Sequence, residues 1–224
     1  MATAWDNYLP DVLLEAPGCP TPIAVNAVRS AAIELCRERN VWQETLALIA
    51  LVAANPLVTI AVPVDSEIST ILDVRFYPVG QTTGVVVSGP ASEMALNALR
   101  PGWKDEANTG TVNSPEVCAY PTPLALRIIP IPVVNQASAI SITAALRPTR
   151  ASTSGPDLLY TDYLDAICTG ALAKLLAMGN KPWTDLAVAA DKRNIFRSAK
   201  SSAGIRVTTA AGAVQQSVYP RTLA

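Results

Sequence analysis

The 224-residue chain contains no histidine, and charged residues make up only 16% of it, against roughly 25% in an average globular domain. Without imidazole the chain lacks the commonest general base and the commonest metal ligand. A catalytic triad built on histidine is therefore excluded. The 11 glycines do not form the spacing of a phosphate-binding or dinucleotide-binding loop. We expect no enzymatic activity, no cofactor and no metal site.

Cysteine is also scarce. The four cysteines, Cys19, Cys36, Cys118 and Cys168, include no CxxC pair, so neither zinc-site nor redox spacing is present. A chain of this length can form a core without disulfides, and we expect free thiols packed as small apolar residues. The segment Met1 to Asp11 lacks the basic and apolar regions of a secretory signal, which is typical of a protein kept in the cytoplasm.

Only one long uncharged apolar run occurs. Leu46 to Val64 is nineteen residues without a charge, the length of a membrane-spanning helix. Asn55 and Pro56 interrupt it, and acidic rather than basic residues, Glu44 and Asp65, flank it. The β-branched residues of its second half favour two buried strands joined by a turn. A membrane span is the weaker alternative, and we expect no membrane partner.

Apolar residues recur at three- and four-residue spacing in three segments, which predicts three helices. The first begins with Thr21 as N-cap and Pro22 in the first turn. The second ends at Gly179 and Asn180 in left-handed geometry. The predicted helices are Thr21 to about Arg39, Asp157 to Gly179, and Thr184 to about Lys200.

The middle of the chain is rich in β-branched residues and is divided by Pro and Gly, a pattern typical of an antiparallel sandwich or meander. One short helix is predicted from its N-cap Ser92 to about Arg100. The predicted strands are Gln43 to Ala53, Leu57 to Val62, Ile68 to Tyr77, Gly84 to Ser88, Val117 to Tyr120, Leu124 to Ile129 and Ala139 to Leu146.

These elements predict an α+β fold, in which a helical bundle layer built from the N- and C-terminal helices carries an inserted antiparallel β domain. Pro10, Pro17, Gly18 and Pro20 predict that the first twenty residues form an extended arm. A second extended arm is expected after the last helix. The predicted divisions are 1–40 for the arm and first helix, 41–147 for the β domain, 148–200 for the C-terminal helices and 201–224 for the C-terminal arm.

The net charge of −1 conceals an uneven distribution. Residues 1–190 carry 11 basic and 17 acidic groups, whereas residues 191–224 carry 6 basic groups and 1 acidic group. Such asymmetry indicates a tail that binds a negatively charged protein or nucleic acid. Arg193, Arg197 and Lys200 share one side of the last predicted helix at i, i+4 and i+7. A solvated helix with a frayed end is the simpler alternative.

Aromatic residues lie at the predicted element boundaries. There they either clamp loops onto the core or anchor a subunit interface. The candidates for subunit-interface contacts are Trp5, Tyr8, Trp42 and Trp183.

Three carboxylates are close in sequence, namely Asp157, Asp162 and Asp165. Paired carboxylates can act as acid and base without histidine. Acidic residues in the first turns of a helix are expected from capping and the helix dipole alone. A carboxylate-based hydrolase is therefore a weak alternative.

Two blocks of the sequence carry a family resemblance. The first consists of Leu9-Pro10-Asp11-Val12-Leu13, Ala16-Pro17-Gly18-Cys19-Pro20, Pro22, Ala27-Val28-Arg29-Ser30-Ala31-Ala32-Ile33-Glu34-Leu35-Cys36 and Val41-Trp42. The second consists of Ala145-Leu146-Arg147-Pro148, Gly170-Ala171-Leu172-Ala173-Lys174-Leu175-Leu176 and Lys181-Pro182-Trp183. In this order the pieces resemble the head-to-tail adaptor (connector, or head-completion) proteins of tailed bacteriophages.

The resemblance implies a non-enzymatic virion protein, assembled in the host cytoplasm and located in the neck between head and tail. Members of the family form a homo-oligomeric ring, commonly of twelve subunits, that joins the portal protein to the tail or nozzle protein. The ring extends the channel through which genomic DNA leaves, without sequence-specific binding. Another minor virion protein, such as a tail-completion protein, is the alternative.

The resemblance also implies a place for the basic end of the chain, because C-terminal segments of the family often reach the portal. Residues 79–122 and the tail after residue 200 match no part of the family. The portal-contact candidates are Arg193, Arg197, Lys200, Arg206, Tyr219 and Arg221.

Overall fold

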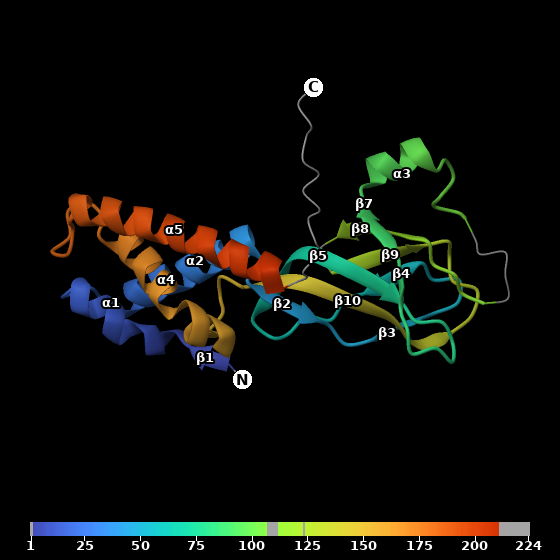
Figure 1. Cartoon of the computed structure of the whole chain (residues 1–224), viewed down its shortest axis with the longest axis horizontal. Helices are drawn as coiled ribbons and strands as arrows, with labels where there is room; N and C mark the ends of the chain where they lie inside the picture. Colours follow the sequence, from blue (N-terminus) through green and yellow to red (C-terminus); the bar gives the residue numbers. More distant parts are fainter. Residues whose placement is uncertain (1, 107–111, 123, 211–224) are drawn as a thin grey trace, which may run out of the picture.

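The computed structural model describes residues 2–106, 112–122 and 124–210. Figure 1 shows an elongated molecule with a helical layer at one end and a β domain at the other. The α+β class, with helices and mainly antiparallel sheets, is confirmed. The first and last described elements both lie in the helical layer, so the β domain is inserted between them.

The helical layer is built around a central helix, α4, that contacts each of the other helices of the layer. Its buried residues are distributed around most of its circumference, as expected for a helix enclosed by others. A two-stranded sheet, β1 with β11, ties the start of the chain to the start of α4. The elements are β1 (Ala2–Ala4), α1 (Leu9–Glu15), α2 (Thr21–Arg39), β11 (Ser154–Pro156), α4 (Asp157–Leu175) and α5 (Leu186–Ala210).

The N-terminal arm is not extended, so that prediction is wrong. Residues 2–15 form β1, the 3-10 helix η1 (Trp5–Tyr8) and α1. Pro10 lies in the first turn of α1, where a backbone N–H has no partner within the helix and its loss costs little. Val12 is fully buried, so the arm packs on its own subunit.

The predicted range of α2 is confirmed, although its N-cap is Pro20 rather than Thr21. For α4, the N-cap is Pro156 rather than Asp157. The left-handed residue after α4 is Asn180, with φ of 58°, and Gly179 is not left-handed. Asparagine tolerates this conformation, so either residue of the pair could have supplied it.

The last helix is longer than predicted. α5 continues past Lys200 to Ala210, so residues 201–210 do not belong to an extended arm. Ala203 is buried and Val207 packs against the helical core, which explains why the helix continues. The remainder of the predicted arm lies outside the described residues.

The β domain consists of two sheets that enclose an apolar core. The larger sheet has the order β2-β10-β5-β6, with β3 also paired to the long strand β10. Its strands are β2 (Trp42–Thr45), β3 (Ile49–Leu51), β5 (Ser66–Phe76), β6 (Val85–Val86) and β10 (Gln136–Pro148).

The smaller sheet has the order β4-β9-β8-β7. The pair β7 and β8 is parallel, which the purely antiparallel prediction missed. The predicted short helix is confirmed as α3 (Glu93–Leu99), and the Ser92 side chain accepts a hydrogen bond from the N–H of Ala95. The strands are β4 (Leu57–Thr59), β7 (Ser88–Ala91), β8 (Val117–Thr122) and β9 (Ala125–Ile129).

The uncharged run from Leu46 to Val64 contributes β3 and β4, one to each sheet. The turn between them places Ala54 at a positive φ and pairs Val52 with Asn55. Within residues 2–106, 112–122 and 124–210, no helix combines the length and apolar character needed to cross a bilayer.

Candidate interaction surfaces

The three carboxylates considered for catalysis do not line one hollow: Asp157 lines one, and Asp162 and Asp165 line another. The Asp157 carboxylate accepts a hydrogen bond from the Thr3 hydroxyl and so helps to hold β1 in place. Asp162 and Asp165 are exposed on α4. Among the described residues, no group of three or more carboxylates or thiols is placed to hold a metal ion.

All four cysteines are free and buried. Burial raises the pKa of the Cys36, Cys118 and Cys168 thiols to about 12 and also raises that of Cys19. A thiol with so high a pKa carries little thiolate at neutral pH and is a poor nucleophile. The cysteines therefore serve as small apolar core residues.

Three of the four proposed interface aromatics are buried within their own subunit, so they do not form an exposed anchor. Trp5 is 1% exposed, and its indole N–H donates to the carbonyl oxygen of Ser152 at 3.1 Å. Tyr8 is equally buried and meets the Tyr160 ring edge-on at 5.2 Å. Trp183 belongs to the same core. Only Trp42 is half-exposed, where β2 leaves the helical layer.

The predicted basic stripe of α5 is divided by the fold. Lys200 is buried, and its ammonium donates to Glu34 Oε1 at 2.6 Å and to Glu38 Oε2 at 2.8 Å, both on α2. Lys174 of α4 donates to the other oxygen of Glu34 at 2.7 Å. Lys174, Lys200 and Glu34 therefore join three helices, and the buried Lys200 is not exposed for a portal contact.

The pKa values of this cluster reflect the pairing. Burial by itself raises the pKa of Glu34, but the hydrogen bonds and charges of Lys174 and Lys200 lower it below its ordinary value. Burial likewise opposes the charge of Lys200, yet Glu34 and Glu38 raise its pKa overall. Both shifts favour the charged forms.

Arg193 and Arg197 remain exposed on α5. Together with Lys174 and Lys200 they line a hollow of about 290 Å³, in which Glu34 is the only carboxylate among the described lining residues. Arg197 donates to the Asn194 side chain at 3.4 Å, and no described carboxylate pairs with either arginine. This side of α5 keeps an excess of positive charge.

A second hollow, of about 650 Å³, lies where α2 and α5 end beside the β domain. Arg39, Leu72 and Ile205 are among its lining residues. The buried Nε of Arg39 and Oδ1 of Asn40 have no hydrogen-bond partner in the described part of the chain. An unsatisfied buried polar atom is unfavourable; the Arg39 Nε–H needs an acceptor, and Asn40 Oδ1 needs a donor.

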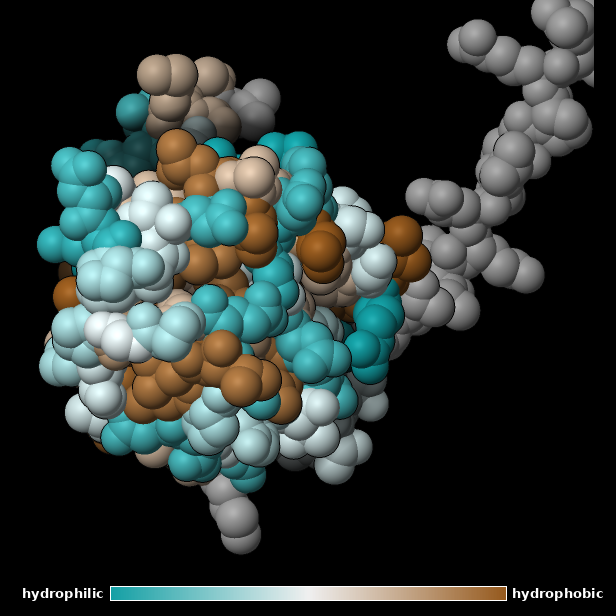
Figure 2. Space-filling model, turned by 90° about the vertical axis from the view of Figure 1, so that its left-hand side faces the viewer, coloured by the Kyte–Doolittle hydropathy of each residue, from teal (hydrophilic) through white to brown (hydrophobic). Residues whose placement is uncertain are grey.

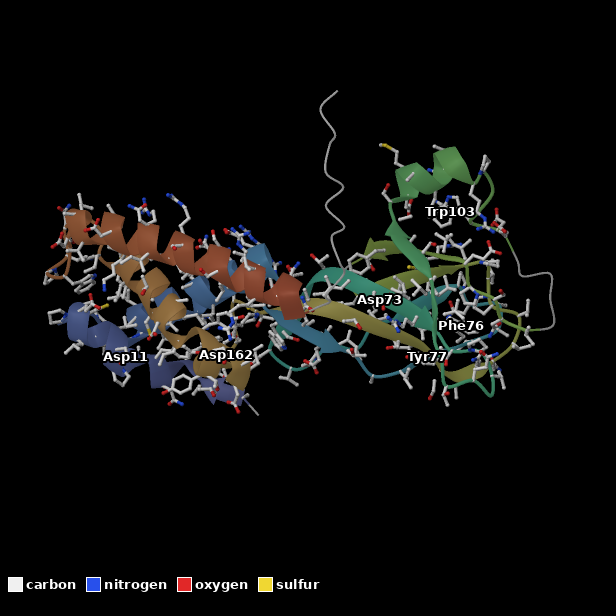
Figure 3. The ribbon with its side chains drawn as sticks, viewed as in Figure 1. Asp11, Asp73, Phe76, Tyr77, Trp103 and Asp162 are labelled. Atoms are coloured by element: carbon white, nitrogen blue, oxygen red, sulfur yellow. The ribbon has the colours of Figure 1, made fainter. Side chains whose placement is uncertain are left out.

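The opposite side of α5 is acidic, a feature that the sequence analysis missed. Asp162 and Asp165 line a hollow of about 350 Å³ between α4 and α5, beside Arg206. Burial is the main cause of the raised pKa of Cys168, and the negative charges of Asp11 and Asp165 raise it further. Asp11 of α1 and Asp165 of α4 therefore lie near the same thiol. Figure 3 shows Asp11 and Asp162 in the lower part of the helical layer, below α5. No sequence signal joins residues so far apart in the chain.

The remaining portal-contact candidates have different settings. Arg206 is exposed, and its guanidinium lies 5.7 Å from the centre of the Tyr163 ring. Tyr219 and Arg221 lie outside the described residues. The structure thus keeps Arg193, Arg197 and Arg206 at the surface and removes Lys200 from the set.

The free end of the helical layer carries separate apolar patches among polar side chains, as Figure 2 shows. α1 ends and α5 begins at this end. Leu14 near the end of α1 is 83% exposed, and Leu186 at the start of α5 is 66% exposed.

Comparison of the sequence with models of known protein families and with curated proteins finds no match.

Proposed function

We propose that the chain is a head-to-tail adaptor: a virion protein that forms a ring between the portal and the tail and extends the DNA channel. One observation carries the proposal, namely that the helical segments of the two blocks with the family resemblance pack in one core, whereas Ala145–Pro148 of the second block form the end of β10. Val28 and Leu35 from the first block share a core with Leu172 and Trp183 from the second.

One of the two segments without resemblance lies apart from that core. Residues 79–122 contribute β6, β7, α3 and β8 of the β domain. The other, after residue 200, contributes the end of α5 to the helical layer. The two blocks are more than a hundred residues apart in the sequence, yet their helical segments share a core, and this supports the proposal.

In this role the helical layer supplies contacts between copies, and residues after α5 reach the portal. A ring requires two different surfaces on each copy, which heterologous contacts supply. The basic Arg193 and Arg197 and the exposed Leu14 and Leu186 offer such surfaces on one helical unit. DNA passes through the channel without sequence-specific contacts.

Native mass spectrometry of the purified chain, mixed with the portal protein of the same virus, tests the proposal. We expect complexes with several copies of the chain on one portal ring. A matched variant that ends after Ala210 is expected to fold but to lose attachment. A full-length chain that ignores the portal at every concentration overturns the proposal, and binding to isolated tails alone would favour a tail-completion protein.

A further inference from the structure

The two sides of α5 carry opposite charge. We define the basic seam as Arg39, Arg193 and Arg197, along the contact of α2 with α5. We define the acidic flank as Asp11, Asp162 and Asp165, on α1 and α4. We propose that the basic seam of one copy docks on the acidic flank of a second copy.

This inference deepens the proposed function. The closed ring rests on that function, but the contact between two copies does not. The observation that carries it is the charge complementarity of two surfaces on one rigid helical unit. Each copy uses its seam for one neighbour and its flank for the other, so the contact is heterologous and repeats.

The basic seam has unused binding capacity. Four cationic side chains and one carboxylate line its first hollow, and that carboxylate, Glu34, already binds Lys174 and Lys200. Arg193 and Arg197 are left without a described carboxylate partner. In the neighbouring hollow the buried Nε of Arg39 also lacks an acceptor. Carboxylates from outside the chain can pair with the exposed Arg193 and Arg197.

The acidic flank has carboxylates without cationic partners among the described residues. Asp162 and Asp165 are exposed, and no described lysine or arginine forms an ion pair with them. Arg206, the one cation of their hollow, lies against the Tyr163 ring. Asp11 extends the negative surface onto α1. The flank therefore presents unpaired carboxylates at the surface, whereas the carboxylates beside the seam, Glu34 and Glu38, are already paired with lysines.

A second copy of the chain would bind both the basic seam and the acidic flank, whereas nucleic acid would bind only the basic seam. Phosphate would be attracted by the seam and repelled by the flank. α5, with 25 residues, is about 37 Å long, so a neighbour aligned along it can cover both hollows of the seam. Charge pairs at such an interface chiefly set orientation and association rate, and salt weakens them.

The test uses the full-length chain and charge reversal on each surface. The seam variant is Arg193→Glu with Arg197→Glu, and the flank variant is Asp162→Lys with Asp165→Lys. Sedimentation velocity at about 50 mM and about 500 mM salt measures the dissociation constant for self-association. We expect each variant to weaken self-association at least tenfold at low salt, and high salt to weaken that of the unaltered chain.

An equimolar mixture of the two variants provides the decisive measurement. Every seam in the mixture then has a complementary flank on the other variant, so association should return to within a few-fold of the unaltered chain. The control for the seam variant is Arg150→Glu with Lys181→Glu, which lowers the net charge by the same amount at exposed positions and should leave association unchanged. Thermal unfolding confirms that each variant folds.

This inference is overturned if neither charge reversal changes self-association, or if the full-length chain stays monomeric at low salt. Loss of association in the seam variant without recovery in the mixture also overturns it, because the seam would then bind something other than the flank. These outcomes are separate from portal attachment. A chain that self-associates as described but ignores the portal retains this inference and overturns only the proposed function.

Discussion

At the scale of single residues, close contacts decide more than residue type. Gly155 in β11 packs directly against the Trp5 indole, and a β-carbon there would lie 3.0 Å from Trp5 Cζ2. Trp5 cannot retreat easily, because it is buried and hydrogen-bonded to Ser152. The glycine is therefore required for the N-terminal segment to dock.

We predict that Gly155→Ala lowers the free energy of unfolding by about 1–3 kcal/mol, since it overpacks a filled site. Gly179→Ala is the matched control, because its added β-carbon has nothing within 4 Å, and it should change stability by no more than about 0.5 kcal/mol. Urea unfolding followed by tryptophan fluorescence measures both. Equal stability of the two variants would contradict the close contact.

Lys200 and Glu34 show the same principle for charge. Spacing along α5 predicts an exposed basic side, but Lys200 on this side is buried and pairs with two carboxylates of α2. The Glu34 pKa lies below its ordinary value of 4.5, mainly because the lysine hydrogen bonds exceed the opposing effect of burial. The unfolded state therefore binds a proton at higher pH than the folded state does.

It follows that Glu34 stabilises the fold above its ordinary pKa, and that this contribution is lost as the pH falls through its folded value. We predict that Glu34→Gln makes the unfolding free energy fall less steeply between about pH 5 and about pH 3 than in the unaltered chain. Chemical denaturation at several pH values measures the slope. Asp191→Asn, an exposed change on α5, is the control.

At the scale of elements, tertiary contacts set the length of α5. Its sequence after Lys200 is rich in small and polar residues, which suggests a helix end. Ala203 is nevertheless buried, and Val207 packs on the helical core. Packing against α4 and α2 supports a continuation that local propensity alone does not require.

We predict different results for two truncations. A chain ending after Ala210 should unfold at the same temperature as the full-length protein, because the described core residues of α5 are all retained. A chain ending after Lys200 should lose roughly 2 kcal/mol, since the packing of Ala203 and Val207 is removed. Differential scanning calorimetry distinguishes them, and identical melting of both would show that the last turns of α5 are dispensable.

At the scale of the whole molecule, Trp42 links the helical core to the core between the sheets. Trp42 packs against the helical core and also against the core between the sheets. β2 and the long strand β10 run on from the helical layer, and α2 contacts β10. These contacts make the two parts depend on each other.

We predict that the full-length protein unfolds in a single calorimetric transition, and that Trp42→Ala separates it into two, because the variant removes the side chain shared by both cores. Trp42→Phe retains apolar contact with each core and should keep one transition at a slightly lower temperature. A single transition in Trp42→Ala would show that β10 alone couples the two parts.

The sequence by itself determined most of the elements. The absence of histidine excludes the catalytic arrangements that need it, and helical and strand periodicity located α2, α3 and most strands of the β domain. The strand predicted over Gln43–Ala53 is divided into β2 and β3, and β7 was missed. These features depend on neighbours within a few residues, so they are legible without a structure. The purely antiparallel order failed only at β7 and β8.

Only the tertiary structure decided which polar and aromatic side chains reach the surface. Lys200 pairs with Glu34 across 166 positions of sequence, and Trp5 binds Ser152 across 147. Asp11 and Asp162, which share the acidic flank, are also far apart in the sequence. Spacing within one helix shows which residues face the same way, but whether that face meets solvent or a partner depends on segments that are close only after folding.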